Sequence, residues 1–205
     1  MRDEYLHIER FAISYVWFAA ILAFLLLLGS IWLLLRMRPP EWILNSFILY
    51  VVIWKFSYAL FHLSYVIDMP ASLFFFHGGY RGQFLALFGL LMYWNKVVSN
   101  SFKRHLPYFV VLYLIQFEML LAAIYQNLSL LLVNLLFLII LLFVHHQAST
   151  IAFEWILVLF LLYLIATHLV EPFDEKQILF QLVFISTAYF PIRFRKGGTH
   201  PDASP

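Results

Sequence analysis

The sequence predicts an all-α integral membrane protein, a bundle of about seven transmembrane helices. The first observation is composition: of 205 residues, 64% are hydrophobic and 12% are charged, with a mean hydropathy of +0.88. A water-soluble domain is about half apolar and about a quarter charged. The second observation is that apolar runs of roughly 20 residues, the length that spans a bilayer, recur along the chain. An ordinary soluble globule is therefore excluded.

Seven apolar runs are the predicted spans. The first ends at Pro39 and Pro40, because consecutive prolines cannot continue a helix. The connections between the runs are mostly short, so successive helices are expected to be antiparallel neighbours. The runs are Phe11–Leu35, Trp42–Ile67, Gly82–Val98, Leu106–Tyr125, Leu128–Val144, Ile151–Val170 and Gln177–Phe194.

The Lys and Arg residues predict the orientation, because cytoplasmic connections carry an excess of them. One set of connections holds Arg36, Arg38, Lys96, Lys103, Arg104, Arg193, Arg195 and Lys196. The other set holds Arg2, Arg10, Arg81 and Lys176. The bias predicts that the N-terminus lies outside and the C-terminus lies in the cytoplasm.

The domain organisation follows from the same pattern. Residues 1–196 are expected to form one transmembrane helical domain, and residues 197–205 a small disordered polar tail. The chain has no cysteine, which excludes disulfides and thiolate chemistry. Basic residues are scattered at helix ends, so no nucleic-acid partner is expected. No motif for a cofactor occurs, and the adjacent His145 and His146 point to different helix faces, so no metal site is expected either.

Ionisable side chains inside the predicted spans are costly in lipid and require a reason. Lys55, Tyr58 and His62 are spaced so that they share one face of the second helix. Glu118 lies at comparable depth in the fourth helix and is a candidate partner for Lys55. Two interpretations stay open for this group: a structural lock inside the bundle, or the polar wall of a ligand cavity.

The segment His77-Gly78-Gly79-Tyr80-Arg81-Gly82 precedes the third predicted helix. Glycines allow a backbone or a phosphate to approach closely, and a helix start with a nearby arginine favours an anion. A histidine beside such a site suits acid–base work on a phospholipid. The competing interpretation is a turn that needs glycine, with an interfacial histidine.

These residues carry a resemblance to a known family. The segment His77–Gly82 resembles the H-G-G-x-x-G signature of the prolipoprotein diacylglyceryl transferases. Lys55–Phe61 is similar to that family's R-x-G-Y-x-x-F, and Tyr163–Phe173 is similar to its late Y-G-x-x-R-F-x-x-E-F. The seven spans and the orientation are also those of the family.

The resemblance implies a transferase in the bacterial cytoplasmic membrane. It would move diacylglyceryl from a phosphatidylglycerol-like phospholipid to the lipobox cysteine of a lipoprotein precursor at the outer face. His77 would be the catalytic base or positioning group for the thiol. No cofactor or metal is implied. The expected substrate-binding residues are Gly78, Gly79, Arg81, Gly82, Lys55, Tyr58, His62 and Glu171.

The sequence also departs from the family pattern. Lys55 stands where the family has an arginine, Glu118 stands about where a second is expected, and Thr167 replaces a third. These departures keep an alternative open, a catalytically inactive relative that binds lipid or protein. A small transporter or proton path along Lys55, His62, Glu118 and His168 is a third possibility.

Overall fold

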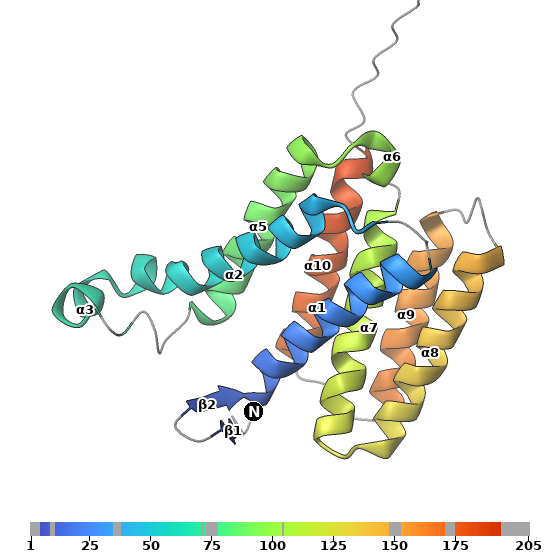
Figure 1. Ribbon diagram of the computed structural model, residues 1–205, viewed down its shortest axis with the longest axis horizontal. Helices are drawn as coiled ribbons and strands as arrows, with labels where there is room; N and C mark the ends of the chain where they lie inside the picture. Colours follow the sequence, from blue (N-terminus) through green and yellow to red (C-terminus); the bar gives the residue numbers. More distant parts are fainter. Residues whose placement is uncertain are drawn as a thin grey trace, which may run out of the picture.

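The computed structural model describes residues 5–8, 11–34, 38–70, 72, 78–103, 105–147, 153–170 and 175–193, which form helices, one short hairpin and the connections between them (Figure 1). Among the described residues, three helices are long and apolar enough to cross a membrane: α1 (Tyr15–Leu34), α2 (Glu41–Phe61) and α7 (Leu106–Ile124). The elements are β1 (Tyr5–Ile8), β2 (Phe11–Ser14), α1 (Tyr15–Leu34), α2 (Glu41–Phe61), α3 (Leu63–Asp68), α5 (Gly79–Val97), α6 (Asn100–Lys103), α7 (Leu106–Ile124), α8 (Leu128–Gln147), α9 (Phe153–Val170) and α10 (Glu175–Arg193).

Helix α7 is the centre of the bundle. It packs against α1, α8, α9 and α10, and it is buried on most of its faces. Val111 and Ile115 are 0% exposed, and Leu112 is 1% exposed. A helix that is apolar on all sides is stable when other helices surround it. Helices α1, α8, α9 and α10 therefore surround α7.

Helices α2 and α5 form a second packed pair. The indole Nε1 of Trp94 on α5 donates a buried hydrogen bond of 2.8 Å to the hydroxyl of Ser46 on α2. Gly89 of α5 has no Cβ, and a Cβ there would overlap the end of the Ile53 side chain of α2. The two helices can approach closely because small residues face the partner, as is common between membrane helices.

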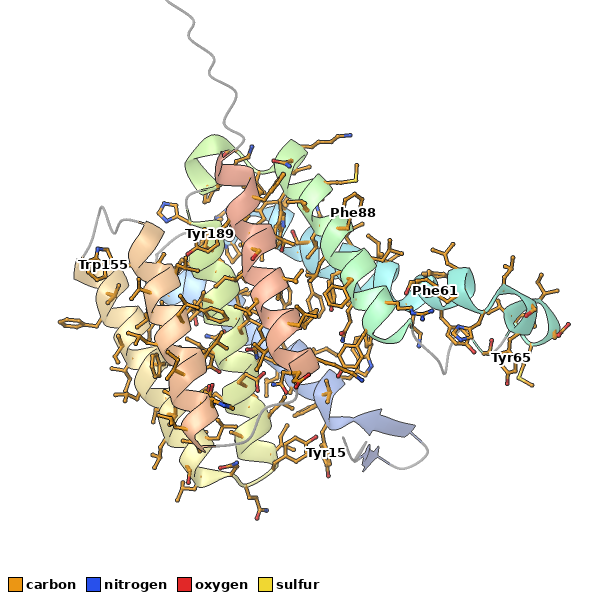
Figure 2. The ribbon with its side chains drawn as sticks, turned by 180° about the vertical axis from the view of Figure 1, so that it is seen from behind. Tyr15, Phe61, Tyr65, Phe88, Trp155 and Tyr189 are labelled. Carbon is orange, nitrogen blue, oxygen red and sulfur yellow. The ribbon has the colours of Figure 1, made fainter. Side chains whose placement is uncertain are left out.

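The far end of this pair extends away from the rest of the molecule. Helix α3 continues from α2 and lies well apart from α8 and α9 (Figure 1). Figure 2 shows Phe61 and Tyr65 on this arm, away from the bundle. No residue of α3 is buried.

The outer surface of the bundle is apolar. Large side chains such as Trp155, Phe143 and Leu128 are more than half exposed on α9 and α8, and Figure 2 shows Trp155 and Phe88 pointing outward. A soluble monomer rarely exposes apolar patches of this extent. The surface and the three long apolar helices together support the predicted membrane class.

The structure corrects the predicted start of the first helix. Phe11–Ser14, predicted as helical, is the strand β2, which pairs antiparallel with β1 so that Tyr5 faces Ser14 and Ile8 faces Phe11. Isoleucine, tyrosine and phenylalanine favour strands, whereas a continuous apolar run does not distinguish strand from helix. The helix begins at Tyr15.

The second predicted span, Trp42–Ile67, is also interrupted. His62 leaves the helical conformation, with φ −136° and ψ 44°, and separates α2 from α3. Both backbone groups of His62 stay paired at the break, because its N–H donates to the Tyr58 carbonyl and its carbonyl accepts from the Val66 N–H. The third predicted span begins three residues early, since α5 starts at Gly79. The predicted tail, residues 197–205, lies outside the described residues.

Tyr163→Phe tests the packing of α8 against α9. The Tyr163 hydroxyl donates 2.8 Å to Asn134 Oδ1, and these residues are 1% and 0% exposed. Hydrogen bonds between membrane helices average about 0.6 kcal/mol and reach about 1.7 kcal/mol, so the free energy of unfolding should fall by that amount. Unfolding in mixed micelles measures it. Ser186→Ala is the control, because Ser186 is exposed and bonds to Leu182 of its own helix. Equal losses in both variants would contradict this account of the pair.

Candidate functional site at the start of helix α5

Helix α5 begins at the glycines that the sequence analysis singled out. Gly78 is the N-cap, and the Gly82 N–H donates the first helical hydrogen bond to the Gly78 carbonyl at 2.9 Å. Gly79 has φ +57°, in the left-handed region that residues with a Cβ rarely adopt. The chain can turn into α5 at this point because Gly79 carries no side chain.

The start of α5 is held against α2 by two hydrogen bonds. The Gly78 N–H donates 3.2 Å to the carbonyl of Trp54, and the indole Nε1 of Trp54 donates 3.1 Å to the carbonyl of Gly79. The Trp54 ring also packs on Trp17 of α1, with ring centroids 4.7 Å apart. The segment is thus fixed to two helices of the bundle.

Ser57 fills the space beside two of the glycines. It is 1% exposed, and its hydroxyl donates 2.7 Å to the Trp54 carbonyl. A Cβ at Gly78 or at Gly82 would overlap this hydroxyl. A Cβ at Gly79 would meet nothing within 4 Å. The close approach of α2 therefore accounts for Gly78 and Gly82, whereas Gly79 faces open space into which a ligand could come.

Two positive side chains lie at this helix start. Arg81 is exposed in the first turn of α5, whereas Lys55, also expected to bind substrate, is half-buried on α2 one residue after Trp54. Lys176, in the first turn of α10, lies over the ring of Tyr80, with Nζ 5.6 Å from the ring centroid. The positive end of a helix dipole adds to these charges. The arrangement favours an anion.

Two of the three residues predicted to share a face of α2 are in contact. The rings of Tyr58 and His62 stack, with centroids 4.6 Å apart and planes 17° apart. Tyr58 is buried and His62 is exposed at the end of the helix.

Glu118 and Thr167, two of the residues at which the sequence departs from the resembled motifs, have local partners. Glu118 Oε1 accepts hydrogen bonds of 2.8 Å from Gln177 Nε2 and from Gln181 Nε2 of α10. The Thr167 hydroxyl donates 3.0 Å to carbonyls of its own helix, at Tyr163 and Leu164. The pairing of Glu118 with Lys55 stays a prediction.

The catalytic candidate His77 and the candidate Glu171 lie outside the described residues. Within the parts of the chain that are described, His, Asp and Glu do not gather in the groups of three that a metal site requires. A groove of about 280 Å³ lies between α2 and α5, lined by Asn45, Ile48, Leu49, Val52 and Tyr93. Its residues come from the first half of α2 and the second half of α5, so it belongs to the end of this pair away from Gly79.

Sequence reasoning missed three residues of this site. Trp54 and Ser57 hold the glycines, and Lys176 lies on Tyr80 from a helix distant in the chain. The spacing of Gly78, Gly82 and Ala86 every four residues was the available signal for a packed helix pair. Nothing in the local sequence around Lys176 indicates its contact with Tyr80.

Comparisons with family models, with curated proteins and with solved structures found no match to this chain.

Gly82→Ala tests the close contact of α5 with Ser57. The new methyl group would overlap the Ser57 hydroxyl and lie 3.0 Å from Trp54 Cδ1. Overpacking of this kind costs about 1–3 kcal/mol, so the free energy of unfolding should fall by that much.

The matched variant is Ser57→Ala, which removes the overlapping hydroxyl. In the double variant the Gly82→Ala loss should be smaller than in the wild-type background, because the two sites are in contact. The free energies of unfolding of the wild type, the two single variants and the double variant, measured in detergent, give the interaction energy between the two positions. Strictly additive losses would show that the two residues do not touch.

Proposed function

We propose that this protein is a diacylglyceryl transferase-like enzyme of the bacterial cell membrane. Its substrate would be an anionic phospholipid such as phosphatidylglycerol, and its acceptor the lipobox cysteine of a lipoprotein precursor. The observation that carries the proposal is the contact between two segments that resemble family motifs. Lys55–Phe61 and His77–Gly82 are separated in the chain, yet Trp54 and Ser57 join α2 to Gly78, Gly79 and Gly82.

The proposed topology has seven spans: α1, α2, α5, α7, α8, α9 and α10. The distribution of Lys and Arg supports an outside N-terminus and a cytoplasmic C-terminus. The start of α5, the end of α2 and the start of α10 would then lie together at the outer face. A phospholipid headgroup in the outer leaflet would meet Arg81 and Lys176 at this level.

The proposed reaction transfers the diacylglyceryl group to sulfur. A bond forms between the thiol sulfur of the acceptor and the diacylglyceryl carbon that carried the phosphate oxygen. The bond from that carbon to oxygen breaks, and glycerol phosphate leaves with the electron pair. His77, which directly precedes Gly78 in the chain, would take the thiol proton. Gly79 and Arg81 would hold the phosphate at the helix start.

His77→Ala tests catalysis directly. Purified protein with phosphatidylglycerol and a lipobox peptide should form a thioether-linked product, detected by mass spectrometry. General acid–base groups contribute about 10²–10⁴-fold, so the variant should lose activity by that factor. His105→Ala is the control, because His105 is an exposed histidine at the start of α7. A wild-type protein without product, beside an active standard transferase, would reject the enzyme proposal.

A specific observation favours a second candidate, a relative that binds phospholipid without turnover. Where the family has arginines, Glu118 accepts two amide donors and Thr167 bonds to its own helix. Neither side chain supplies a positive charge to a transferring phosphate. Loss of such charges removes stabilisation of the transition state more than it removes binding.

Arg81→Ala and Lys55→Ala test lipid binding, which both candidates require. Each basic residue near a headgroup contributes about 1 kcal/mol, so each change should weaken binding of phosphatidylglycerol roughly fivefold. Native mass spectrometry with a titrated lipid measures the change. Lys96→Ala is the control, because Lys96 is an exposed lysine in the last turn of α5. An equal effect of all three changes would place the lipid elsewhere.

A further inference from the structure

The groove between α2 and α5, with a volume of about 280 Å³, follows one face of α2. Ile48, Leu49 and Val52 supply its apolar lining, and their spacing places them on one face of the helix. Asn45, one turn before Leu49, and Tyr93 of α5 complete the lining. The groove is therefore apolar along most of its length and carries two polar side chains.

The apolar part of the groove continues into the exposed surface of α2. Val52, Phe56 and Leu60 are spaced one turn apart, and all three side chains are exposed. Because α2 is long and apolar enough to cross a membrane, an exposed apolar stripe along it faces the acyl chains of lipids. The occupant that fits a groove continuous with this stripe is an acyl chain.

The two polar side chains lie at the same level of the helix pair. Their chain neighbours, Ser46 and Trp94, are joined by the hydrogen bond of 2.8 Å. Asn45 lies four residues after the start of α2 and Tyr93 four residues before the end of α5, so each is about 6 Å from a helix end. Near this level of a bilayer the acyl chains end at their ester groups.

The chemistry of Asn45 and Tyr93 matches an ester. An amide N–H and a phenolic O–H both donate hydrogen bonds, and an ester carbonyl only accepts them. Among the described residues, neither of these two side chains has a hydrogen-bond partner. A polar group beside apolar surroundings is costly without a partner. Two donors beside an apolar groove therefore fit the ester end of a lipid chain.

The charges at this end of the groove do not favour an anion. Glu41 precedes Asn45 by one turn on α2, and Lys96 follows Tyr93 by three residues on α5. Both are exposed, and their charges are opposite. The start of α5 differs, because Arg81 there adds to the positive end of a helix dipole.

We propose that the α2–α5 groove binds a phospholipid through its ester carbonyl groups and not through the charge of its headgroup. One acyl chain lies along Ile48, Leu49 and Val52, and Asn45 and Tyr93 donate to the ester carbonyls. In the proposed orientation this lipid belongs to the cytoplasmic leaflet, at the end of the helix pair away from Gly79. The site is separate from the proposed transferase site and does not depend on it.

An ether-linked lipid tests the recognition of the ester. Phosphatidylcholine and its diether analogue with the same chains differ in the two carbonyl groups, so native mass spectrometry with each lipid measures what those groups contribute. A hydrogen bond in a membrane is worth about a threefold change in affinity on average, so the wild type should bind the diester at least about threefold more tightly.

Two variants locate this preference. Tyr93→Phe and Asn45→Leu should each reduce the preference for the diester, and the double variant should bind both lipids equally. Tyr189→Phe is the control, because Tyr189 is a half-buried tyrosine of α10 that does not line the groove. Equal binding of the two lipids by the wild type, or a preference that survives in the double variant, would overturn the proposal.

Filling the groove tests where the acyl chain lies. Ile48 is exposed toward lipid, so Ile48→Trp can occupy the groove without disturbing the packed core, and it should remove the diester preference. Ile139→Trp is the matched control, since Ile139 is an exposed isoleucine of α8. A diester preference that is unchanged in Ile48→Trp would show that the lipid lies elsewhere and reject this site.

Discussion

The carbonyl of Trp54 is the point on which the candidate site depends. It accepts from the Ser57 hydroxyl of its own helix and from the Gly78 N–H of the next one. The Gly78 N–H reaches the Trp54 carbonyl because α5 approaches α2 so closely that no Cβ fits at Gly78 or Gly82. Gly78, Gly82, Ser57 and Trp54 thus form one packed contact between α2 and α5. This contact sets the direction in which α5 begins.

The fold could be predicted where composition decides it. Apolar runs as long as α1, α2 and α7 have few alternatives to spanning helices, because their backbone groups must pair within the segment. The predictions were wrong at the ends of runs. At Phe11–Ser14 the side chains are as apolar as those of the following helix, and pairing with Tyr5–Ile8 decides the conformation. At His62 the helix breaks although both backbone groups of this residue stay paired, and neither a glycine nor a proline marks the position in the sequence.

The candidate site could be predicted only in part, for a related reason. The sequence shows the glycines at 78, 79 and 82. It does not show which of them packs against α2, because that depends on the position of a residue in α2. Ser57 fills the space at two of the positions, and Gly79 alone remains open. The Lys176 contact is of the same kind, since residues almost a hundred positions apart meet only through the order of helices in the bundle.

Helix α10 connects the two polar regions of the protein. Consecutive residues in its first turn reach different partners: Lys176 reaches Tyr80 beside the glycines, and Gln177 reaches Glu118 in the bundle. Because both side chains leave the same turn, the position of α10 places a lysine beside the glycines of α5 and an amide donor beside the buried carboxyl group of α7.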